Sequence, residues 1–442
     1  MQFSDFNLNK ALFNALDDLG IQEATAIQSK TFGPIMSGKD VVGIAQTGTG
    51  KTFAFLLPSL RLWKFSKSPY PQILILVPTR ELVAQVVAEA EKLTKYMTFQ
   101  VVGVYGGTNI RTQKAEVAQG ADMIVGTPGR LLDLLKDGVI KTKNLKRLIV
   151  DEVDEMFNLG FRTQLNGIVE FIPEKRQNLM FSATLPEEVI EIIDNYTDYY
   201  EQIEAAPSGA PLENIDQCQY ELENFNSKAN MLVWLLQSQA DMTKVLVFVS
   251  TKKMADVLYE RMLPTFEESV GIIHSSKSQN LRFATVERFQ DGTHRFIIAT
   301  DVIARGLDVS LVTHVVNFDL NEVAENYIHR IGRTGRAEQM GQAISFVSSK
   351  ESETLEKIEA LMGQPIPIKI LPEEVELSTE LIDLEKTVEF IPFNNHKIKQ
   401  HKPSGEAFHE KAEKNKKVNK RRDYEEEMKK KYKKQYKKRR EK

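Results

Sequence analysis

Short apolar runs alternate with amphipathic stretches along most of the chain. In the first half the apolar runs are DVVGIA, ILILVP, VVGVYGG, MIVGTP, RLIVDE and LMFSAT. Several are apolar on both faces, as buried parallel strands are. A second series follows with KVLVFVST, RFIIAT, HVVNFD and AISFVSS, and helical patterns such as ELVAQVVAEAEKLTKY separate the runs. This alternation predicts an α/β protein with mostly parallel sheets covered by helices.

The two series of predicted strands indicate two tandem domains. Between them lies EAAPSGAPLEN, whose Ala, Pro, Ser and Gly content is typical of a linker. We therefore expect a first domain over residues 1–205, a linker over 206–211 and a second domain over 212–365. The periodicity fades after Gln364, which leaves an extension over 366–401 and a tail over 402–442. The tail sequence KKYKKQYKKRR predicts either disorder or a fully solvated helix.

Composition adds a charge asymmetry to this organisation. The chain is 42% hydrophobic and 27% charged, which is typical of a soluble globular protein. Its net charge of -3 combines a tail with 18 Lys/Arg and 8 Asp/Glu, a net of +10, with a body of -13. A basic tail on an acidic body favours a polyanionic partner.

Two further observations concern the compartment. No stretch approaches the roughly 18 apolar residues that a membrane span needs, and the N-terminal segment MQFSDFNLNKALFNALDDLG is acidic rather than signal-like. The single cysteine, Cys218, excludes an internal disulfide and a cysteine-rich zinc site. We therefore expect a cytoplasmic protein without a membrane anchor.

AQTGTGKT follows the first apolar run and opens an apolar helix, and it resembles a phosphate-binding loop. Backbone N–H groups at such a loop cradle phosphate at a helix N-terminus. In this pattern the lysine reaches the β- and γ-phosphates and the following hydroxyl binds Mg²⁺. The candidate nucleotide-binding residues are Ala45, Gln46, Thr47, Gly48, Thr49, Gly50, Lys51 and Thr52, with Ala45 in place of the usual first glycine.

RLIVDEVDEMF places acidic residues directly after a buried strand. One interpretation is a helix start, where carboxylates face the positive end of the helix dipole. The other is a magnesium nucleotide site, in which Asp151 binds the metal and Glu152 orients and deprotonates the attacking water. The phosphate-binding loop elsewhere in the same domain favours the second interpretation.

Taken together, the ordered motifs resemble those of the DEAD-box RNA helicases. The motifs are GIQEATAIQ, AQTGTGKT, PTREL, TPGR, DEVD, SAT, ATDVIARGLDV and HRIGRTGR, and the resemblance covers about residues 1–365. It implies two RecA-like domains, ATP and Mg²⁺ as cofactors, and ATP-dependent separation of short RNA duplexes or remodelling of RNA–protein complexes. Val153 and Ala24 depart from the alanine and proline usual in this family.

The resemblance also assigns roles to individual residues. It implies that Gln28 hydrogen-bonds adenine, that Phe3 stacks on its ring and that Asp308 contacts the ribose. Arg333 and Arg336 would reach the γ-phosphate when the two domains close. The residues implied to couple the two domains are Asp154, Ser182, Thr184 and His329.

The implied RNA surface consists of hydroxyls, arginines and backbone amides, which hold sugar and phosphate without reading bases. Taken singly, each of these residues is also typical of an ordinary turn. We expect RNA of any sequence, distinguished from DNA by its 2′-hydroxyls. The implied residues are Thr79, Arg80, Gly107, Thr127, Arg130, Thr251, Thr300 and Arg305.

Two alternatives compete with a helicase. An RNA clamp or annealing protein would use hydrolysis only for release and need not keep Lys51, Glu152 and Arg336 together. A DNA translocase would lack GIQEATAIQ and HRIGRTGR. We expect a monomer whose partners include RNA and ribosomal or other ribonucleoprotein assemblies.

Overall fold

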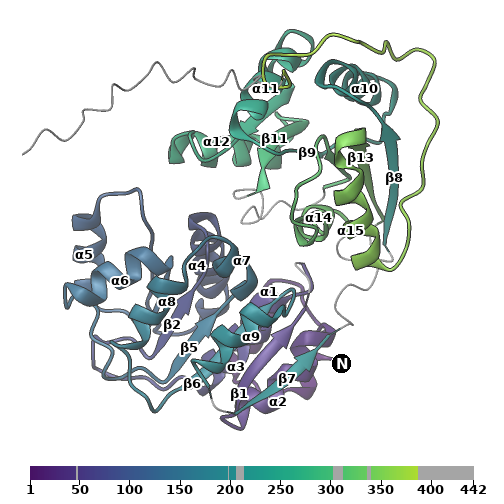
Figure 1. Ribbon diagram of the computed structural model, residues 1–442. Helices are drawn as coiled ribbons and strands as arrows, with labels where there is room; N and C mark the ends of the chain where they lie inside the picture. Colours follow the sequence, from purple (N-terminus) through teal and green to yellow (C-terminus); the bar gives the residue numbers. More distant parts are fainter. Residues whose placement is uncertain (46–47, 198, 206–213, 302–311, 336–339, 387–442) are drawn as a thin grey trace, which may run out of the picture. The chain divides into compact units, whose positions relative to one another are not determined.

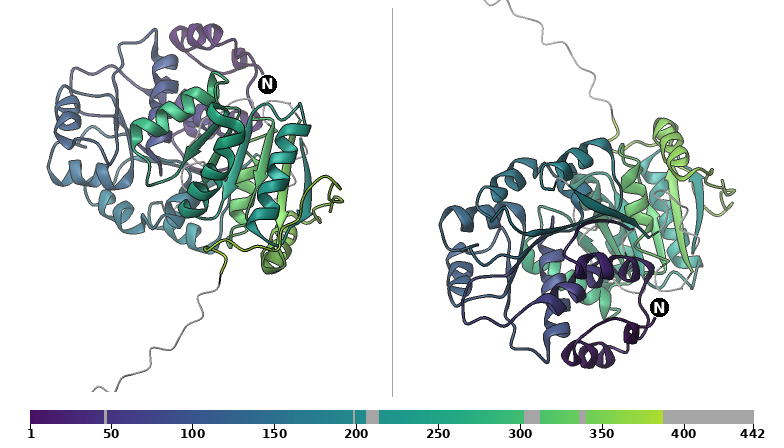
Figure 2. Two further views of the ribbon diagram at one scale, coloured as in Figure 1. Left: turned by 90° about the horizontal axis from the view of Figure 1, so that it is seen from above. Right: turned by 90° about the horizontal axis from the view of Figure 1, so that it is seen from below.

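The computed structural model describes residues 1–45, 48–197, 199–205, 214–301, 312–335 and 340–386. Within these residues the strands form two sheets, and every paired strand runs parallel to its neighbour. Helices cover both faces of each sheet (Figure 1, Figure 2). This confirms the α/β class and the tandem parallel sheets. No described helix is long and apolar enough to cross a membrane.

The first sheet has seven strands in the order β3-β4-β2-β5-β6-β1-β7. Its strands are β1 (Asp40–Ile44), β2 (Ile73–Leu76), β3 (Val101–Val104), β4 (Met123–Gly126), β5 (Arg147–Val150), β6 (Gln177–Ser182) and β7 (Tyr200–Glu204). The helices are α1 (Lys10–Asp18), α2 (Ala26–Met36), α3 (Lys51–Leu62), α4 (Arg80–Thr94), α5 (Ile110–Ala118), α6 (Pro128–Lys136), α7 (Val153–Asn158), α8 (Arg162–Val169) and α9 (Glu187–Asp194), with a 3-10 turn at Phe3–Asp5.

Alternation along each strand divides the first core into two layers. In β2, Ile73 and Ile75 join the cluster under α1 to α4, whereas Leu74 and Leu76 join the cluster under α5 to α9. Successive side chains of a strand point to opposite faces, so a strand that is covered on both sides must be apolar throughout. The continuous run ILIL follows from this burial.

The second sheet has six strands in the order β10-β11-β9-β12-β13-β8. Its strands are β8 (Ile215–Glu221), β9 (Val245–Val249), β10 (Val270–Ile273), β11 (Phe296–Thr300), β12 (His314–Asn317) and β13 (Gly341–Val347). The described helices are α10 (Phe225–Ser238), α11 (Lys252–Phe266), α12 (Gln279–Gln290), α14 (Glu325–Ile331) and α15 (Ser352–Met362), with 3-10 turns at Glu267–Ser269 and Ser349–Glu351.

Residues 366–386, which we call the C-terminal strap, pack on the second sheet although their sequence shows no periodicity. The N–H of Gln219 in β8 donates to the Pro367 carbonyl at 2.9 Å, and the Lys369 N–H donates back to the Gln219 carbonyl at 2.8 Å. Side-chain amides of α10 hold the rest of the strap, with Asn230 donating to the Glu376 carbonyl at 2.9 Å. Val375 is buried in the core beneath α10. The strap therefore covers the outer edge of β8.

Candidate nucleotide and RNA site

The predicted phosphate-binding loop lies at the carboxyl end of β1, where α3 begins at Lys51. Gly48 and Gly50 have φ of 85° and 91°, a conformation that favours glycine. A Cβ on Gly50 would also lie 2.4 Å from Nε2 of Gln28, so a larger residue would displace that side chain. Free N–H groups at a helix start suit a phosphate. Gln46 and Thr47 lie outside the described residues.

Gln28 fixes this loop from α2. Its Nε2 donates to the Gly50 carbonyl at 3.1 Å, and its Oε1 accepts from the Thr25 N–H at 2.9 Å. Phe3 is 2% exposed, and its ring centroid lies 5.4 Å from that of Phe6. Contacts of Gln28 and Phe3 with adenine therefore stay predictions, and stacking requires a ring face of Phe3 that is covered here.

The acidic residues of DEVD lie at the carboxyl end of β5, on a strained turn. Glu152 has φ of 51°, which is uncommon for a residue with a side chain, and its N–H donates to Oδ1 of Asp151 at 3.0 Å. Strain of this kind gathers at functional sites. Val153 begins α7 and is fully buried, so the departure from alanine is accommodated by packing.

Burial raises the pKa of both carboxyl groups. It raises the pKa of Glu152 to about 7, against the opposing charges of Lys51 and Arg333 and with a further rise from Asp151. Burial also raises the pKa of Asp151, although Lys51 opposes it. A carboxylate whose pKa lies near neutrality is suited to act as a general base.

The site fits a nucleotide that carries a divalent cation. Among the described residues, the buried Nζ of Lys51 and the buried Oε2 of Glu152 have no hydrogen-bond partner. Buried charged groups normally have partners, so these two atoms call for a ligand. The Lys51 ammonium is suited to phosphate. The carboxylate of Asp151 and the hydroxyl of Thr52 are the oxygen donors that Mg²⁺ prefers.

Asp154 organises the turn that follows β6. Its Oδ2 accepts from the N–H of Thr184 and from the Thr184 hydroxyl, both at 3.0 Å. The Asp154 N–H donates to Oγ of Ser182 at 3.3 Å. Nε2 of His329, from α14 of the second domain, lies 3.8 Å from Oδ2 of Asp154. The structure thus brings together all four residues that the resemblance assigned to coupling.

Arg333 follows α14 and is 5% exposed, with its Nε donating to the His329 carbonyl at 3.3 Å. Its charge is near enough to Glu152 to lower the pKa of that carboxyl. Arg336, Asp308 and Arg305 lie outside the described residues, and their roles stay predictions.

The predicted RNA residues occupy the starts of helices and the end of a strand. Thr79 and Thr251 cap α4 and α11, and their hydroxyls accept from the N–H groups of Leu82 at 3.3 Å and Met254 at 3.1 Å. Thr127 precedes α6. Thr300 ends β11. A helix start offers backbone N–H groups, which suit a backbone phosphate.

Two arginines of this predicted surface are engaged within the protein. Arg130 is 9% exposed and donates to Oε1 of Gln113 at 2.6 Å and to the Thr108 carbonyl at 3.0 Å. The Arg80 guanidinium lies within 2.5 Å of where a Cβ on Gly107 would stand, and Gly107 has φ of 77°. Arg130 therefore fixes the loop before α5, and Gly107 makes room for Arg80.

Sequence reasoning missed a buried group on α12. Arg282 pairs with Glu81 of α4, and Gln279 donates its Nε2 to Oε1 of Glu81 at 2.9 Å. Glu81 lies inside the PTREL motif, but no periodic pattern marks Gln279 and Arg282. Their spacing of three residues on one helix face is the only signal they give.

Arg330 was also missed, although it lies within HRIGRTGR. Its Nη2 donates to Oδ2 of Asp301 at 2.7 Å, and its Nη1 donates to the Asp319 carbonyl at 2.6 Å. Its guanidinium carbon lies 5.2 Å from the centroid of the Phe248 ring. This buried arginine holds the ends of β11 and β12 together.

Two family models match the chain. The DEAD/DEAH box helicase model matches residues 25–192, and the helicase conserved C-terminal domain model matches residues 227–338. The DEAD-box ATP-dependent RNA helicase CshA of Bacillus subtilis is 38% identical over 357 residues, covering 81% of this chain and 72% of CshA. The ATP-dependent RNA helicase DeaD of Buchnera aphidicola is 37% identical over 384 residues, covering 87% of this chain and 63% of DeaD.

Solved structures give the same picture. S. cerevisiae Dbp5 bound to RNA and ADP BeF3 is 29% identical with a TM-score of 0.74, covering 84% of this chain and 95% of that chain. Mss116p bound to ssRNA and AMP-PNP is 26% identical with a TM-score of 0.77, covering 85% of this chain and 80% of that chain. These similarities extend over both sheets.

Proposed function

Because the chain belongs to the DEAD-box ATP-dependent RNA helicases, we propose specific roles for its residues in the hydrolytic cycle. Glu152 is the general base. The observation that carries this assignment is a buried carboxylate on a strained turn, with Oε2 unpartnered among the described residues and a pKa near 7. A base held in this way accepts a proton from the attacking water.

Positive groups converge on the same carboxylate. Lys51 binds the β- and γ-phosphates, and Arg333 and Arg336 stabilise the charge that develops on the transferred phosphoryl group. Asp151 and Thr52 would hold Mg²⁺, which would neutralise charge on the phosphates. Gln28, Phe3 and Asp308 select the adenosine part, with Gln28 also fixing the phosphate loop through Gly50.

Coupling runs through Asp154. Its carboxylate ties the SAT turn to the DEVD turn within the first domain and lies 3.8 Å from His329 of the second. A change at the phosphate site therefore reaches the residues that join the two domains. RNA bound along the helix starts at Thr79, Thr127 and Thr251 would contact both domains.

The substrate is RNA of any sequence, because the proposed contacts are to sugar and phosphate. The chain separates short duplexes locally or remodels RNA–protein complexes, including ribosomal assemblies. It acts as a cytoplasmic monomer. The support for RNA is that Dbp5 and Mss116p have structures with RNA bound.

An RNA clamp that hydrolyses ATP only for release is the second candidate for how this chain uses ATP. The test measures ATP turnover with no nucleic acid, with single-stranded RNA and with single-stranded DNA, together with separation of a short RNA duplex. We expect RNA, and not DNA, to stimulate ATP turnover. We expect strand separation to require ATP. Glu152→Gln should retain ATP and RNA binding and lose about a hundredfold or more in turnover. Turnover near that of the wild type would contradict the role of Glu152, and stable RNA holding without strand separation would favour the clamp.

A further inference from the structure

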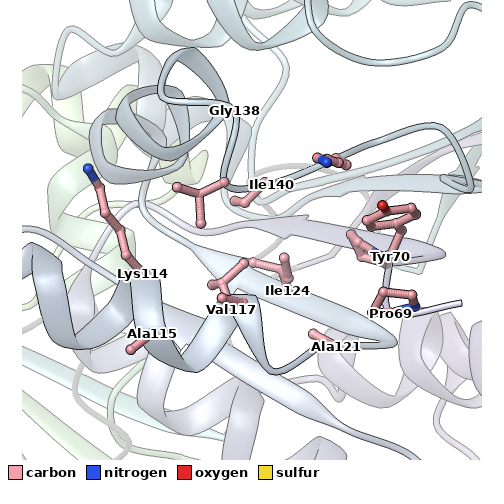
Figure 3. Close-up of a pocket in the computed structure, with 13 residues that line it drawn as sticks. Pro69, Tyr70, Lys114, Ala115, Val117, Ala121, Ile124, Gly138 and Ile140 are labelled. Carbon is pink, nitrogen blue, oxygen red and sulfur yellow. The ribbon is translucent and has the colours of Figure 1, made fainter.

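A cavity of about 590 Å³ opens in the first domain, among residues that the helicase cycle does not use (Figure 3). Its walls are the loop 69–71 before β2, the residues 114–121 of α5 and the following turn, and the loop 138–141 after α6. Loop 69–71 and the turn at 120–121 lead into the amino ends of β2 and β4. The phosphate loop and DEVD follow the carboxyl ends of β1 and β5. The cavity and the nucleotide site therefore lie at opposite ends of the strands of the first sheet.

The floor of the cavity is apolar and buried. Val117, Ala121, Ile124 and Ile140 line it, all four are less than 7% exposed, and all four belong to the core cluster under α5 to α9. Figure 3 shows Val117, Ile124 and Ile140 gathered at its centre. The floor is thus an outward extension of the packed core. An apolar side chain placed there would be removed from water, which favours binding.

The loop at residue 69 is fixed against the turn that follows α5. The Ala121 N–H donates to the Pro69 carbonyl at 3.2 Å. Gly120 has φ of 106°, and a Cβ on it would lie 3.2 Å from Pro69, so a side chain there would be strained and crowded. The cavity is therefore a built feature of the fold, held open by a proline-flanked loop.

The rim is positively charged. Nζ of Lys143 lies 4.5 Å from the Tyr70 ring centroid and Nζ of Lys141 lies 5.7 Å from it. Lys114 pairs with Asp137 at 2.8 Å. Three lysines thus stand near the mouth with one paired carboxylate, on a body whose first 401 residues carry a net charge of -13. A local positive rim on an acidic body selects an anionic partner.

We propose that this cavity binds an acidic peptide segment of a protein partner, with one large apolar side chain on the floor and flanking carboxylates on Lys114, Lys141 and Lys143. The occupant is a peptide rather than RNA because the Tyr70 ring already carries lysine ammonium groups, which leaves that face unavailable for stacking a base. Cavities of roughly 300–1,000 Å³ suit such an anchor. Since the cavity and the nucleotide site lie at opposite ends of the strands, the helicase would bind this partner without loss of ATP binding.

The test uses the full chain and a fluorescein-labelled probe peptide, Glu-Asp-Leu-Phe-Glu-Asp, followed by fluorescence anisotropy at low salt. Because the basic tail would itself attract an acidic probe, each titration is repeated in a chain lacking residues 402–442. Ala118→Trp fills the cavity from an exposed position of α5, and Ala88→Trp is the matched change on the exposed face of α4. Lys141→Glu with Lys143→Glu reverses the rim charge, and Lys175→Glu is the control at an exposed site elsewhere in the domain.

We expect the cavity and rim variants to weaken peptide binding about tenfold or more, which corresponds to about 1.4 kcal/mol. The two control variants should bind as the wild type does, and a probe with Ser-Ser in place of Leu-Phe should bind weakly to all. RNA-stimulated ATP turnover should be unchanged throughout. Equal probe affinity in Ala118→Trp and Ala88→Trp would overturn the proposal, and so would displacement of the probe by single-stranded RNA from the variant lacking 402–442.

Discussion

Arg282 of α12 and Glu81 of α4 form a buried ion pair that joins the second domain to the first, with side chains 10% and 6% exposed. Gln279 strengthens this contact: its Nε2 donates to Oε1 of Glu81 at 2.9 Å, and its Oε1 accepts from Arg282 at 3.1 Å and from Arg80 at 3.3 Å. Arg80, a predicted RNA-binding residue, is therefore hydrogen-bonded to a residue of the contact between the two domains. Binding of RNA at Arg80 and joining of the domains would influence one another through these side chains.

Glu81→Gln should lower RNA-stimulated ATP turnover roughly tenfold or more, because a hydrogen bond to a charged group contributes ~1.5–3 kcal/mol and its loss leaves Arg282 buried without its counterion. Turnover at saturating RNA measures this effect. Glu89→Gln is the control, since Glu89 lies on the same helix in an exposed pair with Lys92. If the effects of Glu81→Gln and Arg282→Gln simply add in the double variant, the pair does not act as a unit.

Arg333→Ala and Arg336→Ala should each abolish most hydrolysis while leaving ATP affinity nearly unchanged. These side chains come from the second domain, so their energy is expressed in the transition state rather than in nucleotide binding. ATP affinity and single-turnover hydrolysis of the full chain separate the two quantities. Residues 1–205 alone hydrolysing ATP as fast as the full chain would show that the second domain contributes no catalytic group.

Glu351 should make stability depend on acid pH. Burial tends to raise the pKa of Glu351, but Lys228, at 2.9 Å, and the bonds from Ser348 outweigh burial and hold the pKa below its ordinary value of 4.5. A lowered native pKa stabilises the fold above the ordinary pKa, and this stabilisation is lost as pH falls through the native value.

Glu351→Gln should therefore lower the urea midpoint at pH 7, with a loss of ~1–3 kcal/mol for the broken charged contact, and the difference from the wild type should shrink as the pH falls below the ordinary pKa of 4.5. Glu353→Gln on the exposed side of α15 controls for the loss of one charge. A difference of the same size at both pH values would assign the effect to packing rather than to ionisation.

Deleting residues 402–442 should weaken RNA binding and flatten its dependence on salt, because the tail carries 18 Lys/Arg whose phosphate contacts release counterions. Tyr432 and Tyr436 in this segment offer surfaces on which unpaired bases can stack. ATP turnover at saturating RNA should stay close to that of the full chain. Titrations at several salt concentrations measure RNA affinity and its dependence on salt. An unchanged salt dependence after deletion would make the tail a solubilising segment. Loss of a protein partner with intact RNA affinity would make it a docking segment.

In the described sheets, the sequence pattern predicts every interior strand but only one of the four edge strands, β3. Ten of the strands coincide with the apolar runs, whereas β7, β8 and β10 were not recognised. All three lie at the edge of a sheet. Residues such as Asp216 and Glu221 in β8 are exposed, so the strand lacks the continuous apolar run that burial on both faces requires.

The chemistry of the site could be predicted where it depends on short motifs. The phosphate loop, DEVD and SAT carry their roles in local sequence, and the structure brings Lys51, Glu152 and Asp154 to one edge of the first sheet. Gln279, Arg282 and the anchoring of Arg330 could not be predicted in this way, because their meaning depends on which distant segment packs against them. Contacts of this kind depend on the tertiary fold and produce no periodic pattern in the sequence.

The C-terminal strap changes where the folded unit ends. The family match stops at residue 338 and the last described helix ends at Met362, yet Gln219, Asn224 and Asn230 bind backbone as far as Ser378. A protease that cuts between 366 and 378 would consequently do more than release the basic tail. It would uncover the edge of β8 and the apolar surface beneath Val375, which are the features that promote edge-to-edge association of sheets. Clipped molecules should therefore be removed by aggregation rather than persist as a trimmed, active helicase.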